Sequence, residues 1–259
     1  MSALGAIFLK IQPVSRNYRI LQGDCLERMQ ELPDQSIDMV LCDPPYAMTH
    51  QKWDSIIPLE PMWDQLKRIV KPKGAILLFG AQPFTAMLIC SNLKMFRYMW
   101  VWDKMKSSGH LNCNRAPLRY HEEISVFYAK AGSYKPQMTK GKMMLKGGSK
   151  GGDLYLSANN PVRYQSDTYY PKSIISIKGL MGHEKIHPTE KPVPLLEYMI
   201  KTYTEEGETV LDFCAGSGST AEAAIRTGRK FIGIELDPKW HETSKHRAAI
   251  TWQRLNRKS

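Results

Sequence analysis

Short apolar runs alternate with amphipathic segments along most of this 259-residue chain. The apolar runs predict strands over residues 18–21, 37–42, 75–79, 96–102, 123–128, 209–213 and 231–235. Apolar residues at helical spacing predict helices over residues 61–70, 84–93, 196–203, 219–227 and 238–255. Strands that alternate with helices are typical of a mostly parallel sheet covered on both faces, so the pattern predicts an α/β fold.

Residues 131–185 depart from this pattern, because they are rich in Gly, Ser, Lys and Tyr and show no sustained period. This segment holds nine Lys and Arg against three Asp and Glu, so its formal charge is nine minus three, or +6. The whole chain carries +11, and over half of that charge therefore lies in this segment. A basic insert of this kind indicates a polyanionic partner such as nucleic acid. A solvated charged loop is the alternative.

The overall composition is that of an ordinary globular protein, with 42% hydrophobic and 24% charged residues. The longest apolar run, residues 75–79, is far too short to cross a bilayer, and residues 1–9 lack the basic start of a secretion signal. The five cysteines form no C-x-x-C pair and the seven histidines no H-E-x-x-H motif. We therefore expect reduced thiols, no metal site and a cytoplasmic location.

A glycine-rich turn, Asp212-Phe-Cys-Ala-Gly216-Ser-Gly218, follows one predicted strand and opens a predicted helix. Glycines at such a turn let the main chain approach a bound nucleoside closely. Glu235 ends the next predicted strand, where a carboxylate can accept hydrogen bonds from both ribose hydroxyls. These residues indicate a nucleoside cofactor. An NAD site fits the same spacing, and a glycine turn without a ligand is a further alternative.

A second motif, Asp43-Pro44-Pro45-Tyr46, follows the predicted strand 37–42. The two prolines fix φ and remove two N–H groups, so this stiff loop presents the Asp43 carboxylate and main-chain carbonyl groups as acceptors. The exocyclic amino group of a base carries two N–H donors, which two such acceptors can hold. The Tyr46 ring is suited to stack on that base. The motif indicates a site for a base amino group, and a plain turn is the alternative.

The order of these motifs resembles that of the DNA amino-methyltransferases in their permuted β group. Members of that family carry D-P-P-Y or S-P-P-Y before the cofactor glycine motif, with a target-recognition region between the two. This chain has Asp43 to Tyr46, then the basic insert, then His187-Pro-Thr-Glu-Lys-Pro192, then the glycine motif. Gly23-Asp24 and Trp102-Asp-Lys104 are also similar to the family, and the resemblance spans about residues 18–240.

The resemblance implies a Rossmann-like, circularly permuted, mostly parallel sheet of seven strands. It divides the chain into a catalytic half (1–130), a target-recognition insert (131–185) and a cofactor-binding half (186–259). The target base is assigned to Asp43, Pro44, Pro45 and Tyr46. For S-adenosylmethionine, Asp24 is assigned to the adenine, Glu235 to the ribose, and Thr189 and Lys191 to the closure of the pocket. The walls of that pocket are assigned to Asp43, Asp212, Phe213, Cys214, Ala215, Gly216, Ser217 and Gly218.

The resemblance also implies a substrate. Asp rather than Ser at position 43 favours adenine N6 over cytosine N4, and Asp rather than Asn points away from relatives that modify glutamine side chains and some RNAs. No Pro-Cys pair is present, which argues against methylation of cytosine C5, since that reaction needs a cysteine nucleophile. Cytosine-N4 methylation, RNA base methylation and a catalytically silent DNA-binding protein are the alternatives.

The expected reaction takes the target base out of the duplex, because its amino nitrogen is hidden in the base stack. Asp43 and the Pro44 carbonyl accept the two amino hydrogens and turn the nitrogen lone pair towards the sulfonium methyl group, with no metal required. The expected partner is double-stranded DNA, which places the protein at the nucleoid. A homodimer and a cognate restriction nuclease are compatible with the resemblance.

Overall fold

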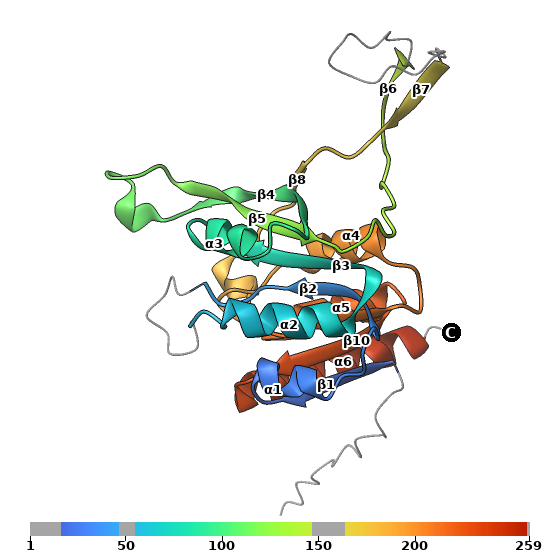
Figure 1. Cartoon of the computed structure of the whole chain (residues 1–259). Helices are drawn as coiled ribbons and strands as arrows, with labels where there is room; N and C mark the ends of the chain where they lie inside the picture. The colour runs from blue at the N-terminus through green and yellow to red at the C-terminus, as the bar shows by residue number, and fades with distance from the viewer. Residues whose placement is uncertain (1–16, 47–54, 147–163, 258–259) are drawn as a thin grey trace, which may run out of the picture.

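The computed structural model describes residues 17–46, 55–146 and 164–257 (Figure 1). The described strands are β1 (Tyr18–Gln22), β2 (Ile37–Cys42), β3 (Val70–Gly80), β4 (Phe96–Ser108), β5 (Arg119–Phe127), β6 (Thr139–Lys146), β7 (Tyr164–Tyr169), β8 (Ile174–Ser176), β9 (Thr209–Asp212) and β10 (Lys230–Glu235). The described α-helices are α1 (Cys25–Gln30), α2 (Leu59–Ile69), α3 (Phe84–Ser91), α4 (Val193–Tyr203), α5 (Ser219–Arg226) and α6 (Pro238–Asn256). Two single-turn 3-10 helices cover His110–Asn112 and Gly182–Glu184.

Eight of the described strands form one sheet in the order β1-β10-β9-β2-β3-β5-β4-β8. The strands from β1 to β3 run parallel, β5 runs antiparallel to β3 and β4, and β8 runs parallel to β4. β6 and β7 pair with each other as an antiparallel ribbon that projects from the body of the molecule (Figure 1). The predicted α/β fold with a mostly parallel sheet is confirmed.

The predicted count of seven strands is wrong, because β8 adds an eighth to the sheet. β8 comes from the predicted insert, and its residues Ile174–Ser176 pair with Val101–Asp103 of β4. A strand of three residues is too short to show a hydrophobic period, so pairing with β4 decides its conformation. The boundaries of the three predicted regions remain a prediction.

β6 and β7 were not predicted, and α1 and β3 also differ from the sequence pattern. α1 was not predicted, and it begins where the Asp24 carboxylate accepts the main-chain N–H groups of Leu26 at 2.8 Å and Glu27 at 3.4 Å. A helix this short shows no period, so its cap is its main sequence signal. β3 begins at Val70, directly after α2, rather than at Ala75. The intervening segment, including Pro72, is extended, because a proline φ suits a strand start as well as a helix end.

Both faces of the sheet are covered by helices. Met39 and Leu41 of β2 belong to a buried cluster with α4, α5 and α6, whereas Val40 and Cys42 belong to a second cluster with α1, α2 and α3. This alternation is the two-residue period of a strand, and burial on both faces explains why Ile37–Cys42 is apolar almost throughout.

The strand order reverses between β9 and β2. From β9 the chain continues through α5 to β10 on one side, and from β2 it continues through α2 to β3 on the other. The carboxyl ends of adjacent parallel strands then diverge into helices on opposite faces, which opens a crevice at this point. The glycine turn after β9 and the Asp43 loop after β2 meet there, although they are far apart in the sequence.

Candidate active site

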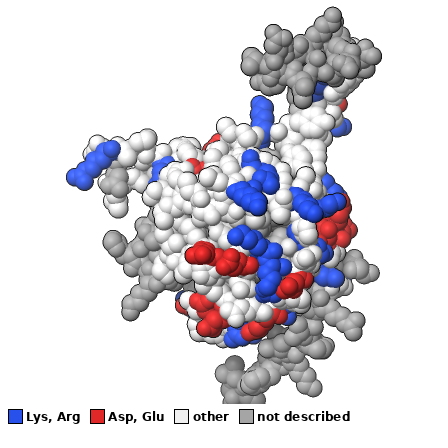
Figure 2. Space-filling view, viewed as in Figure 1, with Lys and Arg blue, Asp and Glu red and all other residues white. Residues whose placement is uncertain are grey.

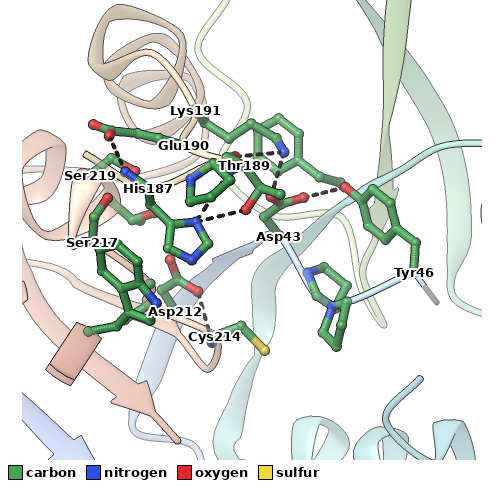
Figure 3. Close-up of a pocket in the computed structure, with 18 of the residues that line it drawn as sticks. Asp43, Tyr46, His187, Thr189, Glu190, Lys191, Asp212, Cys214, Ser217 and Ser219 are labelled. Atoms are coloured by element: carbon green, nitrogen blue, oxygen red, sulfur yellow. Dashed lines mark hydrogen bonds and ion pairs between the residues drawn. The ribbon is translucent and has the colours of Figure 1, made fainter. Parts of the chain in front are cut away.

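A cavity of about 910 Å³ lies at this edge of the sheet. Loops that follow β1, β2, β9 and β10 line it, together with the segment that precedes α4 (Figure 3). Every predicted site residue except Gly218 lines the cavity: Asp24, Asp43, Pro44, Pro45, Tyr46, Thr189, Lys191, Asp212, Phe213, Cys214, Ala215, Gly216, Ser217 and Glu235. The fold therefore gathers three separate motifs around one space.

The glycine turn between β9 and α5 is fastened to β10. The Ala215 N–H donates to the Ile234 carbonyl at 2.9 Å, and the Gly216 N–H donates to Glu235 Oε2 at 2.7 Å. Gly216 has a φ of +51°, which favours glycine, and a Cβ added there would meet no other atom within 4 Å. Open space thus lies beside the main chain of this turn.

Gly218 does not itself line the cavity, although Ser217 and Ser219 on either side of it do, and its place beside the cofactor remains a prediction. It precedes the first residue of α5 with a φ of +80°, and a Cβ there would lie 2.9 Å from Ser244 Cα on α6. This glycine therefore allows α5 and α6 to approach each other closely.

The remaining lining fits a nucleoside cofactor of the S-adenosylmethionine type. Glu235 Oε1 accepts the Asp237 N–H at 2.9 Å and Oε2 accepts the Gly216 N–H, so each oxygen keeps a lone pair for a ribose hydroxyl. Asp24 caps α1 through Oδ1 alone and faces the same cavity. Apolar side chains such as Ile57 and Phe213 provide surfaces against which an adenine ring can pack.

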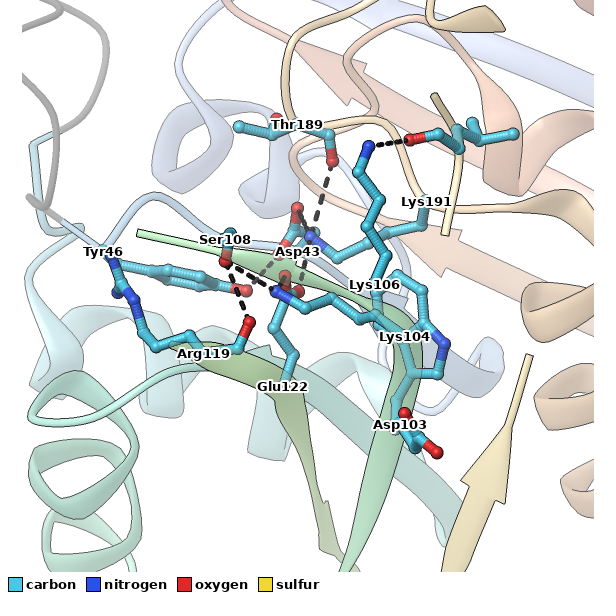
Figure 4. A network of polar contacts seen from close by, with 12 residues as sticks. Asp43, Tyr46, Asp103, Lys104, Lys106, Ser108, Arg119, Glu122, Thr189 and Lys191 are labelled. Atoms are coloured by element: carbon cyan, nitrogen blue, oxygen red, sulfur yellow. Dashed lines mark hydrogen bonds and ion pairs between the residues drawn. The ribbon is translucent and has the colours of Figure 1, made fainter. Parts of the chain in front are cut away.

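The Asp43 loop presents a carboxylate held by two donors. The Tyr46 hydroxyl donates to Asp43 Oδ1 and the Lys191 ammonium donates to Oδ2 (Figure 4). Each oxygen keeps a second lone pair, so the carboxylate is still able to accept a hydrogen from a substrate. The Tyr46 ring stacks on Phe84, with ring centroids 5.1 Å apart. Its predicted stacking on a target base remains a prediction.

The segment from His187 to Pro192 reaches the cavity immediately before α4. Glu190 is buried and accepts the N–H groups of Ile186 at 2.7 Å and His187 at 3.2 Å, while Arg247 of α6 donates to its other oxygen at 2.6 Å. The Thr189 hydroxyl lies 3.0 Å from His187 Nδ1. Glu190 therefore fixes the loop that carries the Lys191 ammonium to Asp43.

Glu122 and Lys104 are among the polar residues of the site that were not predicted. Glu122 of β5 lies with Oε2 3.2 Å from Lys191 Nζ and Oε1 3.4 Å from Lys104 Nζ. The sequence offered a weak signal for Glu122. β5 runs antiparallel to β3, so its first residues lie at the same edge as the carboxyl ends of the parallel strands. A charged residue near the start of such a strand is therefore a candidate site residue.

Burial and mutual attraction set the ionisation of this cluster. Burial raises the pKa of Asp43 although the Lys191 ammonium opposes that shift, and burial raises the pKa of Tyr46 well above its ordinary value. Burial disfavours the charged form of Lys191, but Asp43 and Glu122 more than compensate and raise its pKa. Burial likewise opposes ionisation of Glu122, yet Lys191 and Lys104 lower its pKa. At neutral pH Lys191 is thus cationic, and the Tyr46 hydroxyl is a donor.

The mouth of the cavity is basic. Lys106, Arg119 and Lys185 line it, and residues 104–121 contain no Asp or Glu. Figure 2 shows Lys or Arg, and no acidic side chain, at the outer end of the hairpin formed by β4 and β5. This charge suits the phosphates of a nucleic acid beside the cavity.

Within the described ranges we also looked for membrane-spanning helices and for metal sites. No helix within them combines the length and hydropathy needed to span a bilayer. Their His, Cys, Asp and Glu side chains form no group of three or more with the arrangement of a metal site.

Comparison with known proteins identifies the family. Residues 37–246 match the model of the N6/N4 DNA methylase family, which is most of the chain. The Type II methyltransferase M2.MboI of Moraxella bovis is 28% identical over 260 residues, which cover 90% of this chain and 88% of that protein.

Solved structures share the fold. The M1.HpyAVI–SAM complex superposes with a TM-score of 0.61 at 22% identity, covering 89% of this chain and 99% of that one. The cytosine-N4-specific PvuII DNA methyltransferase gives 0.67 at 16% identity and 93% of both chains. A putative DNA modification methylase from Thermus thermophilus, complexed with S-adenosyl-L-methionine, gives 0.60 at 21% identity, covering 91% of this chain and 96% of that one. The chain therefore belongs to the N6/N4 family of DNA methylases and is an S-adenosylmethionine-dependent DNA methyltransferase.

Proposed function

We propose that the enzyme methylates the N6 amino group of adenine in double-stranded DNA. The observation that carries this proposal is the Asp43 carboxylate at the carboxyl end of β2, in one cavity with the glycine turn of residues 212–218. Asp at this position favours adenine by resemblance to the family. The basic mouth of the cavity and the basic ribbon of β6 and β7 supply surfaces for the phosphates of a duplex.

The residues divide the work between the base and the cofactor. Asp43 and the Pro44 main-chain carbonyl each accept one hydrogen of the amino group, which turns the nitrogen lone pair towards the methyl donor. When bound, S-adenosylmethionine supplies a methyl group already activated on a sulfonium sulfur. The Asp43 carboxylate then stabilises the positive charge that develops on the amino nitrogen.

The same carboxylate is placed to take the proton that the methylated nitrogen must lose. Burial raises the pKa of Asp43, which makes the carboxylate a better proton acceptor, and its hydrogen bond to the amino group defines the path of the proton. Glu235, Asp24 and the glycine turn hold the nucleoside part of the cofactor, and Thr189 borders the same space.

The test is methylation of a mixed-sequence duplex followed by digestion and mass spectrometry of the nucleosides. We expect N6-methyladenine as the product. It should form at the same rate as S-adenosylhomocysteine is released. N4-methylcytosine as the main product would overturn the choice of adenine, and faster methylation of structured RNA than of duplex DNA would overturn the choice of DNA. Release of no S-adenosylhomocysteine with any of these substrates would indicate a silent DNA-binding protein.

The variant Asp43→Ala tests the proposed chemistry. We expect turnover to fall by at least about 10²-fold to 10³-fold, as when other stabilising groups are removed from an active site, with S-adenosylhomocysteine binding within about threefold of the parent. Asp64→Ala is the matched control, because Asp64 is an exposed acid on α2 whose partner Lys67 lies 3.9 Å away. Near-normal turnover of Asp43→Ala would show that another group holds the amino nitrogen.

A further inference from the structure

Glu122 has no place in the reaction described so far, yet it lies beside the Asp43 carboxylate (Figure 4). It belongs to β5, opposite Trp102 of β4, and its side chain is 20% exposed. Its Oε1 lies 3.4 Å from Lys104 Nζ, and its Oε2 lies 3.2 Å from Lys191 Nζ. Glu122 therefore joins two lysine ammonium groups inside the site.

Oε2 of Glu122 is shielded from solvent and has no hydrogen bond of good geometry within the described ranges. Its nearest charged neighbour is the Lys191 ammonium, which also donates to Asp43. Lys191 is 7% exposed and also lies 5.1 Å above the Phe79 ring centre. The ammonium is thus held between two carboxylates in a confined space.

This position matters because Lys191 and a target amino group compete for the same partner. The Tyr46 hydroxyl already occupies one side of Asp43 Oδ1, and Lys191 occupies one side of Oδ2. If Lys191 had Asp43 as its sole counter-ion, it would pair more tightly with that carboxylate and hinder the incoming N–H donor, despite the second lone pair on Oδ2. A second carboxylate lets the ammonium shift without losing its counter-ion, since breaking a buried pair is costly.

The cluster is also neutral as a whole. Asp43 and Glu122 contribute two negative charges, and Lys104 and Lys191 contribute two positive charges. The cofactor carries a sulfonium cation into the same cavity, where charges interact more strongly than in water. Loss of the Glu122 charge would leave an excess cation facing that sulfonium.

We propose that Glu122 is a positioning residue of the methyl-transfer site. Glu122 shares the Lys191 ammonium with Asp43, and its negative charge reduces the repulsion between that ammonium and the cationic cofactor. This inference rests on the proposed role of Asp43 as the group that receives the base amino hydrogen. Glu122 acts through Lys191 and has no contact of its own with the reacting atoms.

The test compares two ligands that differ in the charge of their sulfur. S-adenosylmethionine has a sulfonium and S-adenosylhomocysteine a neutral thioether, so the ratio of their dissociation constants measures the electrostatics of the site. In Glu122→Gln we expect S-adenosylmethionine to bind about tenfold more weakly and S-adenosylhomocysteine within about twofold of the parent, both measured by titration calorimetry. Asp64→Asn removes an exposed carboxylate and should leave both constants unchanged.

Two further variants separate charge from packing. Glu122→Asp keeps the charge and should bring the ratio back to within about threefold of the parent. The double variant Glu122→Gln with Lys191→Met removes one charge of each sign, so the ratio should return to the parent value even if both ligands bind more weakly. If Glu122→Gln itself does not fold, the double variant still reports the ratio of the two dissociation constants for a neutral cluster. The single variant Lys191→Met then supplies the test, because loss of one positive charge should shift the ratio in favour of S-adenosylmethionine.

Turnover gives the second readout. At saturating cofactor, Glu122→Gln should lower kcat by about 10-fold to 100-fold with little change in KM for DNA, because Lys191 then competes with the target amino group. A parent-like ligand ratio together with parent-like kcat would overturn the inference. The ligand ratio does not depend on which base is methylated, so it stays decisive even if adenine proves to be the wrong substrate.

Discussion

Asp212 shows how a single side chain of this site is set by its surroundings. It ends β9, is 3% exposed, and accepts the main-chain N–H of Cys214 at 3.1 Å. Burial raises the pKa of Asp212 from 3.8 to about 6, although hydrogen bonds from Thr220 and Cys214 oppose the shift. A carboxyl group that is costly to ionise thus supports the turn on which the cofactor is expected to lie.

The raised pKa of Asp212 makes a prediction about stability. The folded state retains its proton up to about pH 6, whereas the unfolded state loses it near 3.8, so stability falls as pH rises between these values. At about 1.4 kcal/mol per pKa unit, the loss is about 3 kcal/mol. Asp212→Asn has no proton to lose, so its free energy of unfolding in urea should rise relative to the parent by about 2 kcal/mol from pH 4 to pH 7, since part of the loss falls below pH 4. A constant difference between the two proteins across this range would contradict the shift.

At the scale of elements, the segment from His187 to Pro192 is built around Glu190. The side chain of Glu190 is 2% exposed, and its ion pair with Arg247 ties the segment to α6. Arg247 also pairs with Glu222 of α5 at 2.7 Å. The loop that carries Lys191 is therefore connected to both helices beside the glycine turn.

Glu190→Ala should loosen this loop, and Glu190 itself also borders the cavity. Two main-chain N–H groups lose their acceptor and Arg247 loses one of its two carboxylate partners, which should cost about 2–4 kcal/mol of unfolding free energy in urea. S-adenosylhomocysteine should bind more weakly because the loop borders its site. Glu222→Ala is the control: it also removes a partner of Arg247, but it leaves the loop N–H groups paired. Equal effects of both variants on ligand binding would argue against a special role for Glu190.

At the scale of the whole molecule, positive charge lies beside and beyond the mouth of the cavity. The ribbon of β6 and β7 and the basic hairpin of β4 and β5 both project from the body of the molecule (Figure 1). Lys140 and Lys142 on the ribbon are exposed, whereas Lys146 lies over the Tyr169 ring at 3.7 Å and helps to hold the ribbon together. The first two are therefore free to meet phosphates, in keeping with the predicted insert.

Changing Lys140 and Lys142 to Gln should weaken binding to duplex DNA of any sequence. Each phosphate contact contributes about 0.9 to the slope of log affinity against log salt, so the slope should fall by up to about 2. Cofactor binding should stay unchanged. The control changes Lys73 and Lys230, two exposed lysines at the amino ends of β3 and β10, on the opposite edge of the sheet from the cavity. An unchanged slope in the ribbon variant would place the DNA elsewhere.

The sequence by itself determined the elements and the chemistry that depend on local pattern. Apolar runs and helical periods predicted seven strands and five helices of the fold, because burial on two faces leaves a readable pattern in each element. The motifs at Asp43 and Gly216 were also readable, because a stiff proline turn and a tight glycine turn need those residues at those positions. The short elements α1 and β8 escaped, since neither is long enough to show a period. The strands β6 and β7 escaped as well, because residues 131–185 show no sustained hydrophobic period.

The tertiary structure decided which residues share a site. Glu122 and Lys104 are ordinary charges in the sequence, and they join Asp43 and Lys191 only because β5 runs antiparallel between β3 and β4, so that its start lies beside the carboxyl ends of both strands. Gly218 belongs to the glycine motif, yet the close approach of α6 gives it a packing role. Contacts between residues far apart in the chain depend on strand order and helix packing, which local patterns do not encode.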